Sequence, residues 1–258
     1  MLFGGAGRWC MAEFTYPSIE GPTFSFLDAH CVAFEKYDGS NLRFFWDQKR
    51  GWHSTGTRYR WFKADTPMFG PAVEMFQRLY AKGIIETLRR LKEYRGVTEL
   101  VAFCEFFGPS TFSGLHKEDE PKRLVLFDLY LPGCGFVLPK DFVAHFGHLP
   151  IAKLVYEGPF SRSFIEDVQA GKYPVSEGVV AKGVHTRRQR KGKADQEVWM
   201  AKVKPRTWLE ELARRAGESD DLRREYEQNV REQQLPVAEP PEQAEVSAEP
   251  GAAADGEA

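Results

Sequence analysis

Apolar and polar positions alternate in short runs along most of the chain, a pattern typical of strands. These runs predict strands at residues 30–34, 42–46, 52–56, 100–107, 124–131, 175–182 and 198–203. A polar loop covers 110–122, and a strongly basic connection joins the last two strands. We therefore expect a core rich in β-structure.

A helical period replaces the alternation at residues 71–94. Apolar side chains recur there three or four positions apart, at Val73, Phe76, Tyr80, Ile84, Leu88 and Leu91. Pro71 suits a first helical turn, and Gly96 ends the helix. We predict shorter helices at 139–146 and 161–170. Residues 207–234 are also predicted to be helical, with Trp208, Leu209 and Leu212 as their apolar anchor.

Composition narrows the class of protein. The 258 residues include 20 Phe, 9 Tyr and 6 Trp, which suits a β-rich core and surfaces on which bases stack. Apolar runs stay well below the roughly 20 residues that cross a bilayer, so no membrane partner is expected. The N-terminus lacks the apolar core of a signal peptide, and the four cysteines show no C-x-x-C spacing. We interpret them as reduced thiols of a cytoplasmic protein.

Charge is distributed unevenly along the chain. Residues 235–258 hold six acidic side chains and no Lys or Arg, so the rest carries +4 although the whole chain carries −2. Their Pro/Glu/Ala composition predicts a disordered acidic tail. We expect a flexible leader at 1–15, a folded domain at 16–206 and a helical extension at 207–234. A mildly basic body is compatible with a nucleic-acid partner.

One stretch, Glu35-Lys36-Tyr37-Asp38-Gly39-Ser40-Asn41, fits two interpretations. Asp-Gly between two strands is a common hairpin signal, with a solvated lysine beside it. Alternatively, Lys36 ends a buried strand, where desolvation lowers the pKa of an amine and prepares it to act as a nucleophile.

Further charged residues interrupt the apolar runs. Glu105 lies within 101–107, Asp128 follows Phe127, and Glu177 opens another strand. Lys202 and Lys204 share one face of the last strand, because side chains alternate along it. Each alone has an ordinary explanation, such as a charge at a strand end or on a solvated face.

Together these stretches resemble the covalent nucleotidyltransferases, the superfamily of ATP-dependent DNA and RNA ligases and mRNA capping enzymes. Lys36-Tyr37-Asp38-Gly39 matches the family's Lys-x-Asp-Gly motif, and the later stretches follow in the family's order. DNA ligases and capping enzymes usually have arginine where Asn41 stands, so the chain looks most like nick-sealing RNA ligases. The resemblance implies an α+β fold, an ATP-grasp-like adenylation domain of antiparallel sheets flanked by helices, with a short helical C-terminal extension.

The resemblance also implies roles for individual residues. Lys36 would attack ATP to give lysyl-AMP, while Lys202 and Lys204 would hold the phosphate and lower the pKa of Lys36. The backbone near Glu35 would read the edge of adenine. The other nucleotide contacts implied are Phe127 on adenine, Glu105 on the ribose, Arg58 on phosphates, and Asn41. Glu177, Glu105 and Asp38 would position Mg²⁺ or Mn²⁺.

Joining two polynucleotide ends requires a grip on the strand. The candidates for contacts with nicked or single-stranded RNA, or an RNA/DNA hybrid, are Arg58, Arg60, Lys182, Arg187, Arg188, Arg190 and Lys191. The basic connection among them is equally readable as a solvated hairpin tip. The name "connection arginines" is used below for Arg187, Arg188 and Arg190.

The sequence departs from DNA ligases and capping enzymes after Lys204. The residues that follow cannot form the oligonucleotide-binding barrel of those enzymes, so a partner protein could supply missing contacts. A small DNA ligase, a ligase of hybrid nicks and a capping guanylyltransferase are the alternative enzymes. A non-catalytic nucleic-acid-binding module on a ligase-like fold is the alternative outside enzymes.

Overall fold

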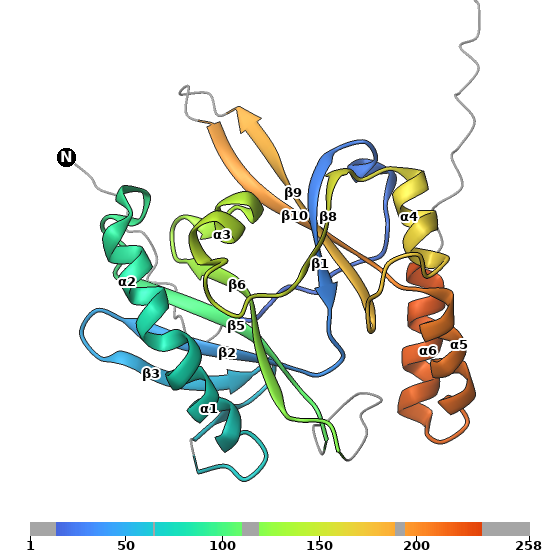
Figure 1. Ribbon diagram of the computed structural model, residues 1–258, viewed down its shortest axis with the longest axis horizontal. Helices are drawn as coiled ribbons and strands as arrows, with labels where there is room; N and C mark the ends of the chain where they lie inside the picture. Colours follow the sequence, from blue (N-terminus) through green and yellow to red (C-terminus); the bar gives the residue numbers. More distant parts are fainter. Residues whose placement is uncertain (1–13, 64, 110–118, 189–193, 234–258) are drawn as a thin grey trace, which may run out of the picture.

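The computed structural model describes residues 14–63, 65–109, 119–188 and 194–233 (Figure 1). Most of the predicted leader, the whole acidic tail, Arg190 and Lys191 lie outside these residues. Arg187 and Arg188 belong to a described strand, but their side chains are also outside the description.

Two antiparallel sheets form the body of the protein. The first has the order β10-β9-β1-β8, from β1 (His30–Lys36), β8 (Leu154–Pro159), β9 (Gly178–Arg188) and β10 (Ala194–Val203). The second has the order β4-β3-β2-β5-β6-β7, from β2 (Ser40–Asp47), β3 (Gly51–Thr57), β4 (Trp61–Phe62), β5 (Glu99–Phe107), β6 (Arg123–Leu131) and β7 (Gly135–Phe136). The predicted mixture of helices and antiparallel sheets is confirmed.

The two strands beside Lys36 do not pair with each other, so the hairpin interpretation is wrong. β1 pairs with β8 and β9, whereas β2 pairs with β3 and β5. Residues 37–39 carry the chain from one sheet into the other. We call these residues the seam.

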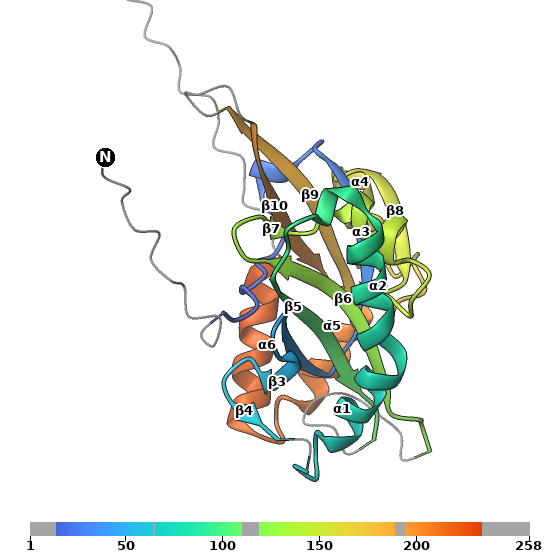
Figure 2. The same ribbon diagram turned by 90° about the vertical axis from the view of Figure 1, so that its left-hand side faces the viewer.

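The long apolar stripe forms one helical run, as predicted. α1 (Gly70–Phe76), a π-helical segment (Gln77–Ala81), α2 (Lys82–Arg90) and a 3₁₀ turn (Lys92–Tyr94) follow one another along one face of the six-stranded sheet (Figure 2). Phe76, Tyr80, Ile84 and Leu88 are buried. The Tyr80 hydroxyl lies 2.7 Å from the Leu124 carbonyl oxygen, which ties the run to β6.

The remaining helices also follow the predicted pattern, with one correction. α3 (Pro139–Phe146) and α4 (Arg162–Gln169) form where expected, and Ser161 caps α4 by accepting from the Phe164 amide at 3.1 Å. A short 3₁₀ turn (Phe24–Phe26) precedes β1. Residues 207–234 instead form two helices packed together, α5 (Arg206–Arg215) and α6 (Asp220–Glu232). The break has a local cause, because the Ser219 side chain caps α6 by accepting from the Leu222 amide at 3.2 Å.

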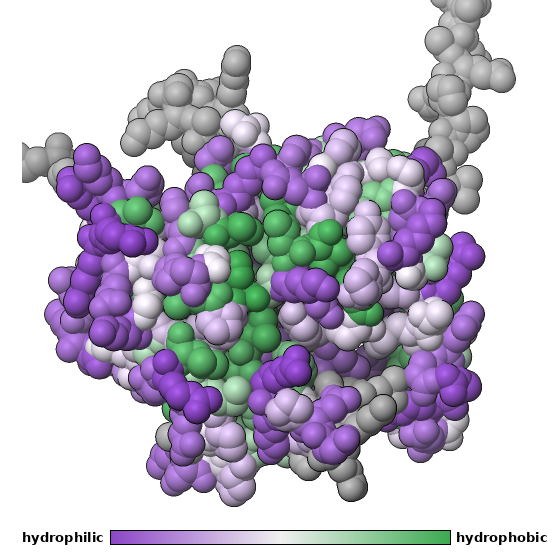
Figure 3. Space-filling model, viewed as in Figure 1, coloured by the Kyte–Doolittle hydropathy of each residue, from purple (hydrophilic) through white to green (hydrophobic). Residues whose placement is uncertain are grey.

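Two apolar cores lie on opposite faces of β1, which adds Val32 and Phe34 to the core of the six-stranded sheet and Cys31 and Ala33 to the other. The six-stranded sheet packs against the long helical run, and the four-stranded sheet packs against α4. On the face shown in Figure 3, apolar residues gather in the middle and hydrophilic residues form the rim. In the described part of the chain, Cys31, Cys104 and Cys134 are free thiols, and no helix is long and apolar enough to span a bilayer.

Candidate active site

A cleft of about 1300 Å³ opens where the two sheets meet. Its walls come from β1 and β9 on one side, from β2 and β5 on the other, and from α6 and residues 57–69 at its mouth. The predicted residues that line it are Glu35, Lys36, Asn41, Arg58, Arg60, Glu105, Phe127, Glu177, Lys182, Lys202 and Lys204. A ligand pocket commonly measures about 300–1000 Å³, so the cleft has room for a nucleotide and part of a second substrate.

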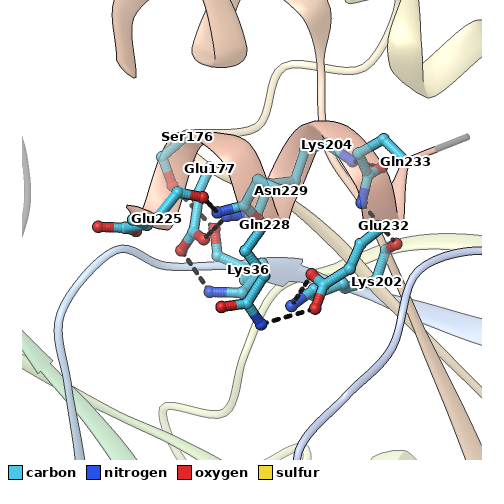
Figure 4. Close-up of polar contacts among 10 residues, drawn as sticks. All are labelled: Lys36, Ser176, Glu177, Lys202, Lys204, Glu225, Gln228, Asn229, Glu232 and Gln233. Carbon is cyan, nitrogen blue, oxygen red and sulfur yellow. Dashed lines mark hydrogen bonds and ion pairs between the residues drawn. The ribbon is translucent and has the colours of Figure 1, made fainter. Parts of the chain in front are cut away.

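Lys36 and Lys204 bind the two oxygens of the same carboxylate (Figure 4). Lys36 Nζ donates to Glu177 Oε2, and Lys204 Nζ lies 2.6 Å from Glu177 Oε1. Glu177 is 4% exposed, so this is a buried bridge between residues far apart in the sequence. This bridge connects the end of β1, the start of β9 and the end of β10.

The carboxylates around Lys36 oppose the predicted fall in its pKa. Burial would lower the pKa of Lys36, but Glu177, Glu105 and Asp38 together raise it above the ordinary value. Lys204, in contrast, has its pKa lowered to about 8, because burial outweighs the attraction of Glu177 and Lys36 adds repulsion. The prediction that Lys202 and Lys204 depress the pKa of Lys36 is therefore wrong for this nucleotide-free arrangement.

Two further carboxyls in this region resist ionisation. Burial raises the pKa of Glu105 to about 8, with Glu177 and Asp38 adding to the rise. Burial also raises the pKa of Asp38 to about 6, again with help from Glu177 and from Glu225 of α6. Carboxyls that raise one another's pKa in this way mark a place where added positive charge is favourable.

Steric crowding explains why two motif positions, 39 and 178, are occupied by glycine. A Cβ on Gly39 would lie 2.5 Å from the Phe106 carbonyl oxygen, so the seam can press against β5 only without a side chain. Gly178 has a φ of +147°, and its Cβ would lie 2.3 Å from the Val203 carbonyl oxygen. Gly178 therefore lets β9 begin beside the end of β10, which places Glu177 between the two lysines.

Asn41 leaves a polar atom unused beside the cleft. Among the described residues, its Oδ1 is buried and has no hydrogen-bond partner. Asn41 lies opposite Glu105 in the β2–β5 pairing. A buried acceptor without a donor is costly unless a ligand satisfies it, which fits the predicted contact with a nucleotide.

Phe127 and Arg58 also face the cleft. The Phe127 ring meets the Tyr16 ring edge-on, with centroids 5.0 Å apart, and this contact fixes its orientation. The positive charge of Arg58 lowers the pKa of Glu105 and of Tyr16, although burial raises both. The guanidinium therefore interacts electrostatically with the floor of the cleft.

Lys182 does not fit its predicted role of gripping nucleic acid. It is 3% exposed, its Nζ lies 2.7 Å from Asp128 Oδ2, and it donates to the Phe127 carbonyl oxygen at 2.8 Å. Tyr16 donates its hydroxyl to the same Asp128 oxygen. These contacts hold β6, and with it Phe127, at the wall of the cleft.

The backbone amide of Glu35 is also engaged. It donates to the Lys153 carbonyl oxygen at 2.8 Å, so this N–H is not free to read the edge of a base. The Glu35 side chain accepts from the amide and hydroxyl of Ser176, both at 3.1 Å. Glu35 thereby fixes the residue that precedes Glu177.

Sequence reasoning missed the contribution of α6. Glu225, Gln228 and Asn229 line the cleft, and Glu232 forms an ion pair with Lys202 at 2.6 Å. The acidic and amide side chains of this helix appear ordinary in the sequence, because only the fold reveals which face they present. Tyr16 was missed for the same reason.

The described residues support a divalent cation only together with another ligand. No group of three or more His, Cys, Asp or Glu among them is arranged to hold a metal ion. The predicted trio Asp38, Glu105 and Glu177 is therefore not a chelating group by itself. Mg²⁺ typically uses one or two carboxylates together with substrate phosphates and waters, and this donor set fits that manner of binding.

Comparison with known proteins agrees with this geometry. A family model described as RNA ligase matches residues 29–204, which is more than half of the chain. A search of curated proteins finds no match.

Solved structures show a similar fold. A mutant of the Naegleria gruberi RNA ligase with AMP and Mn has a TM-score of 0.51 and 14% identity, covering 76% of this chain and 58% of that one. Another mutant, with ATP and Mn, has a TM-score of 0.48 and 15% identity, covering 72% and 53%. The chain thus spans little more than half the length of the Naegleria protein.

Proposed function

Because the chain belongs to the RNA ligase family, we propose that it is an ATP-dependent ligase that joins 5′-phosphate and 3′-hydroxyl RNA ends through Lys36. The observation that carries this proposal is the bridge from Lys36 through Glu177 to Lys204 at the floor of a nucleotide-sized cleft. The predicted ATP-grasp-like adenylation domain at 16–206 and the helical extension at 207–234 are part of the proposal.

Three transfers make up the proposed reaction. The Lys36 amine attacks the α-phosphorus of ATP, a P–N bond forms, and pyrophosphate leaves with the electrons of the broken P–O bond. The 5′-phosphate of an RNA end then displaces Lys36 from the AMP. Finally a 3′-hydroxyl attacks the activated 5′-phosphate, and AMP leaves.

The first transfer requires Lys36 without its extra proton. Lys36 donates a hydrogen bond to Glu177, and the pKa of Lys36 is raised. Loss of the proton from Lys36 is therefore the obstacle to attack on ATP. Positive charge brought in with the nucleotide would compensate Glu177, Glu105 and Asp38, and the pKa of Lys36 would then fall. Lys204 and Lys202 would meanwhile bind phosphate oxygens.

Mg²⁺ or Mn²⁺ is proposed to accompany the nucleotide. The residues best placed to meet it are Glu177 and Glu105, with Asp38 acting through its charge. A divalent cation supplies neutralisation of phosphate charge during phosphoryl transfer. The Naegleria gruberi RNA ligase structure with AMP and Mn, which has a TM-score of 0.51, agrees with this choice.

The RNA end is proposed to enter past residues 57–63. Arg58 and Arg60 line the mouth of the cleft there, where phosphates of a strand could reach them. The connection arginines are proposed as a further contact with the strand: Arg187 and Arg188 belong to β9, whose ribbon with β10 projects from the body in Figure 1, and Arg190 lies outside the described residues. A partner protein that adds contacts to the strand is also part of the proposal.

Labelling with radioactive nucleotide tests the proposal. Purified protein is incubated with α-labelled ATP or GTP and Mg²⁺, denatured, and examined for bound label. We expect label from ATP in the wild type and in Lys172→Ala, since Lys172 is an exposed lysine paired with Asp167 on the surface. Lys36→Ala should carry none.

The outcomes separate the alternatives. Label from GTP alone would indicate a capping enzyme, and absence of label from both nucleotides would favour a binding module. Sealing of nicked RNA, DNA and hybrid duplexes by the labelled protein then identifies the substrate. Sealing only in the presence of a cell extract would point to the partner protein.

A further inference from the structure

The last turn of α6 lies against the end of β10, at Lys202 and the following Lys204 (Figure 4). Glu232 Oε2 is 2.6 Å from Lys202 Nζ, and the two side chains are 20% and 14% exposed. Gln228, one turn earlier, donates to Glu232 Oε1 at 2.8 Å. The carboxylate is therefore held by one oxygen and presents the other to Lys202.

The backbone at this place is fixed by other contacts. Gln233 accepts from the Lys204 amide at 2.8 Å and donates to the Lys202 carbonyl oxygen at 3.3 Å. Gly21 packs so closely on the Glu232 carbonyl that a Cβ would lie 1.5 Å from it. The Glu232 side chain can consequently turn away while the helix end stays in place.

Helix stability does not explain a glutamate at position 232. Glu232 is the last residue of α6, where the helix dipole is negative and an anion costs roughly 0.3–1 kcal/mol. Its position is better explained by the lysines, because Lys36, Lys202 and Lys204 bring three ammonium groups to one cleft. Glu177 forms ion pairs with two of them, Lys36 and Lys204, and Glu232 forms an ion pair with the third, Lys202.

We propose that Glu232 is a positioning residue that occupies the place of a nucleotide phosphate oxygen on Lys202 until ATP displaces it. The inference rests on the proposed function, in which Lys202 binds phosphate. In the nucleotide-free protein, Glu232 keeps Lys202 extended toward the cleft. It also competes with ATP, so the enzyme holds Lys202 ready at the expense of nucleotide affinity.

The experiment compares Glu232→Gln with Glu227→Gln. Glu227 is exposed on the same helix and does not line the cleft, so its replacement makes the same change in charge away from the site. The KM for ATP in Lys36 labelling should fall about three- to tenfold in Glu232→Gln, as expected for loss of a part-buried ion pair. Glu227→Gln should stay within about twofold of the wild type.

A pair that only fastens α6 would behave in the opposite way. Its loss would loosen the wall of the cleft, and the KM would rise or stay constant. Either result in Glu232→Gln, with unchanged thermal unfolding, overturns the inference. In a Lys202→Ala background the Glu232→Gln effect on KM should vanish, because the competition requires both partners.

A binding measurement separates this inference from the function itself. The dissociation constant of ATP is titrated with Lys36→Ala and with Lys36→Ala/Glu232→Gln, neither of which can be labelled. Tighter ATP binding by the double variant supports the role of Glu232 even if the wild type takes no label, a result that would overturn only the proposed function. Equal binding by the two variants overturns the role of Glu232.

Discussion

Replacing Lys182 by methionine tests the buried pair that it forms with Asp128 at the wall of the cleft. Lys182 and Asp128 are both about 3% exposed, and their charged atoms are 2.7 Å apart. Methionine keeps the apolar stem against the Phe34 ring, over which the ammonium lies at 5.0 Å, but removes the charge. Asp128 then remains buried with only the Tyr16 hydroxyl as donor.

The expected loss in the free energy of unfolding is about 3–5 kcal/mol at pH 8, as for other buried pairs that lose one partner. Burial already raises the pKa of Asp128, and losing Lys182 raises it further. Between the unfolded pKa of about 3.9 and the raised folded pKa of Asp128, the folded variant then binds more protons than the unfolded chain. Its stability therefore falls as the pH rises, by up to about 1.4 kcal/mol per pH unit.

Urea unfolding followed by tryptophan fluorescence at pH 5, 6.5 and 8 measures this loss. The matched control is Asp128→Asn/Lys182→Met, which removes both charges and should lose much less stability, with little dependence on pH. A single-variant loss below about 1 kcal/mol at pH 8, or one that is the same at all three pH values, would refute the reasoning.

Three further outcomes are expected. The KM for ATP should increase above pH 8, where free Lys204 loses its proton; a flat KM profile from pH 6.5 to 9.5 would contradict this. Gly178→Ala should lose about 2 kcal/mol or more in urea unfolding and should label poorly, since its Cβ would collide with the Val203 carbonyl, and a wild-type unfolding curve would argue against this. Changing the connection arginines to alanine should weaken RNA binding and flatten its salt dependence without altering labelling; unchanged binding across a salt series would exclude that path.

Local patterns of apolar and polar residues were enough to predict most of the helices and strands. The apolar stripe from Val73 to Leu88 predicts the long helical run, because its period is a property of the helix alone. β8 escaped prediction since it is an edge strand with little buried surface, and its sequence shows no clear alternation. Gly217 and Ser219 signalled the break between α5 and α6, but the dense charge on both sides obscured it.

The sequence was enough to predict which residues form the site, but not the pKa shifts of those residues. Lys36, Glu105, Glu177, Lys202 and Lys204 all reach one cleft, as the motif order suggests. The direction of the pKa shift of Lys36 depends on which charges come nearest in three dimensions, and a sequence does not contain those distances. The burial of Lys182 escaped for the same reason, since Asp128 meets it only when β6 and β9 are brought together.

The crossing of the seam between two sheets has a consequence for biosynthesis. Lys36 meets Glu177 across 141 positions, and Lys202 meets Glu232 near the end of the described chain. Such distant contacts form late, because the chain must close large loops first. A nascent chain on the ribosome would hold Lys36 from an early stage yet lack Glu177, Lys202 and Lys204 until the end of β10 has emerged. Under the proposed function, attachment of AMP to Lys36 should therefore begin only after that point in synthesis.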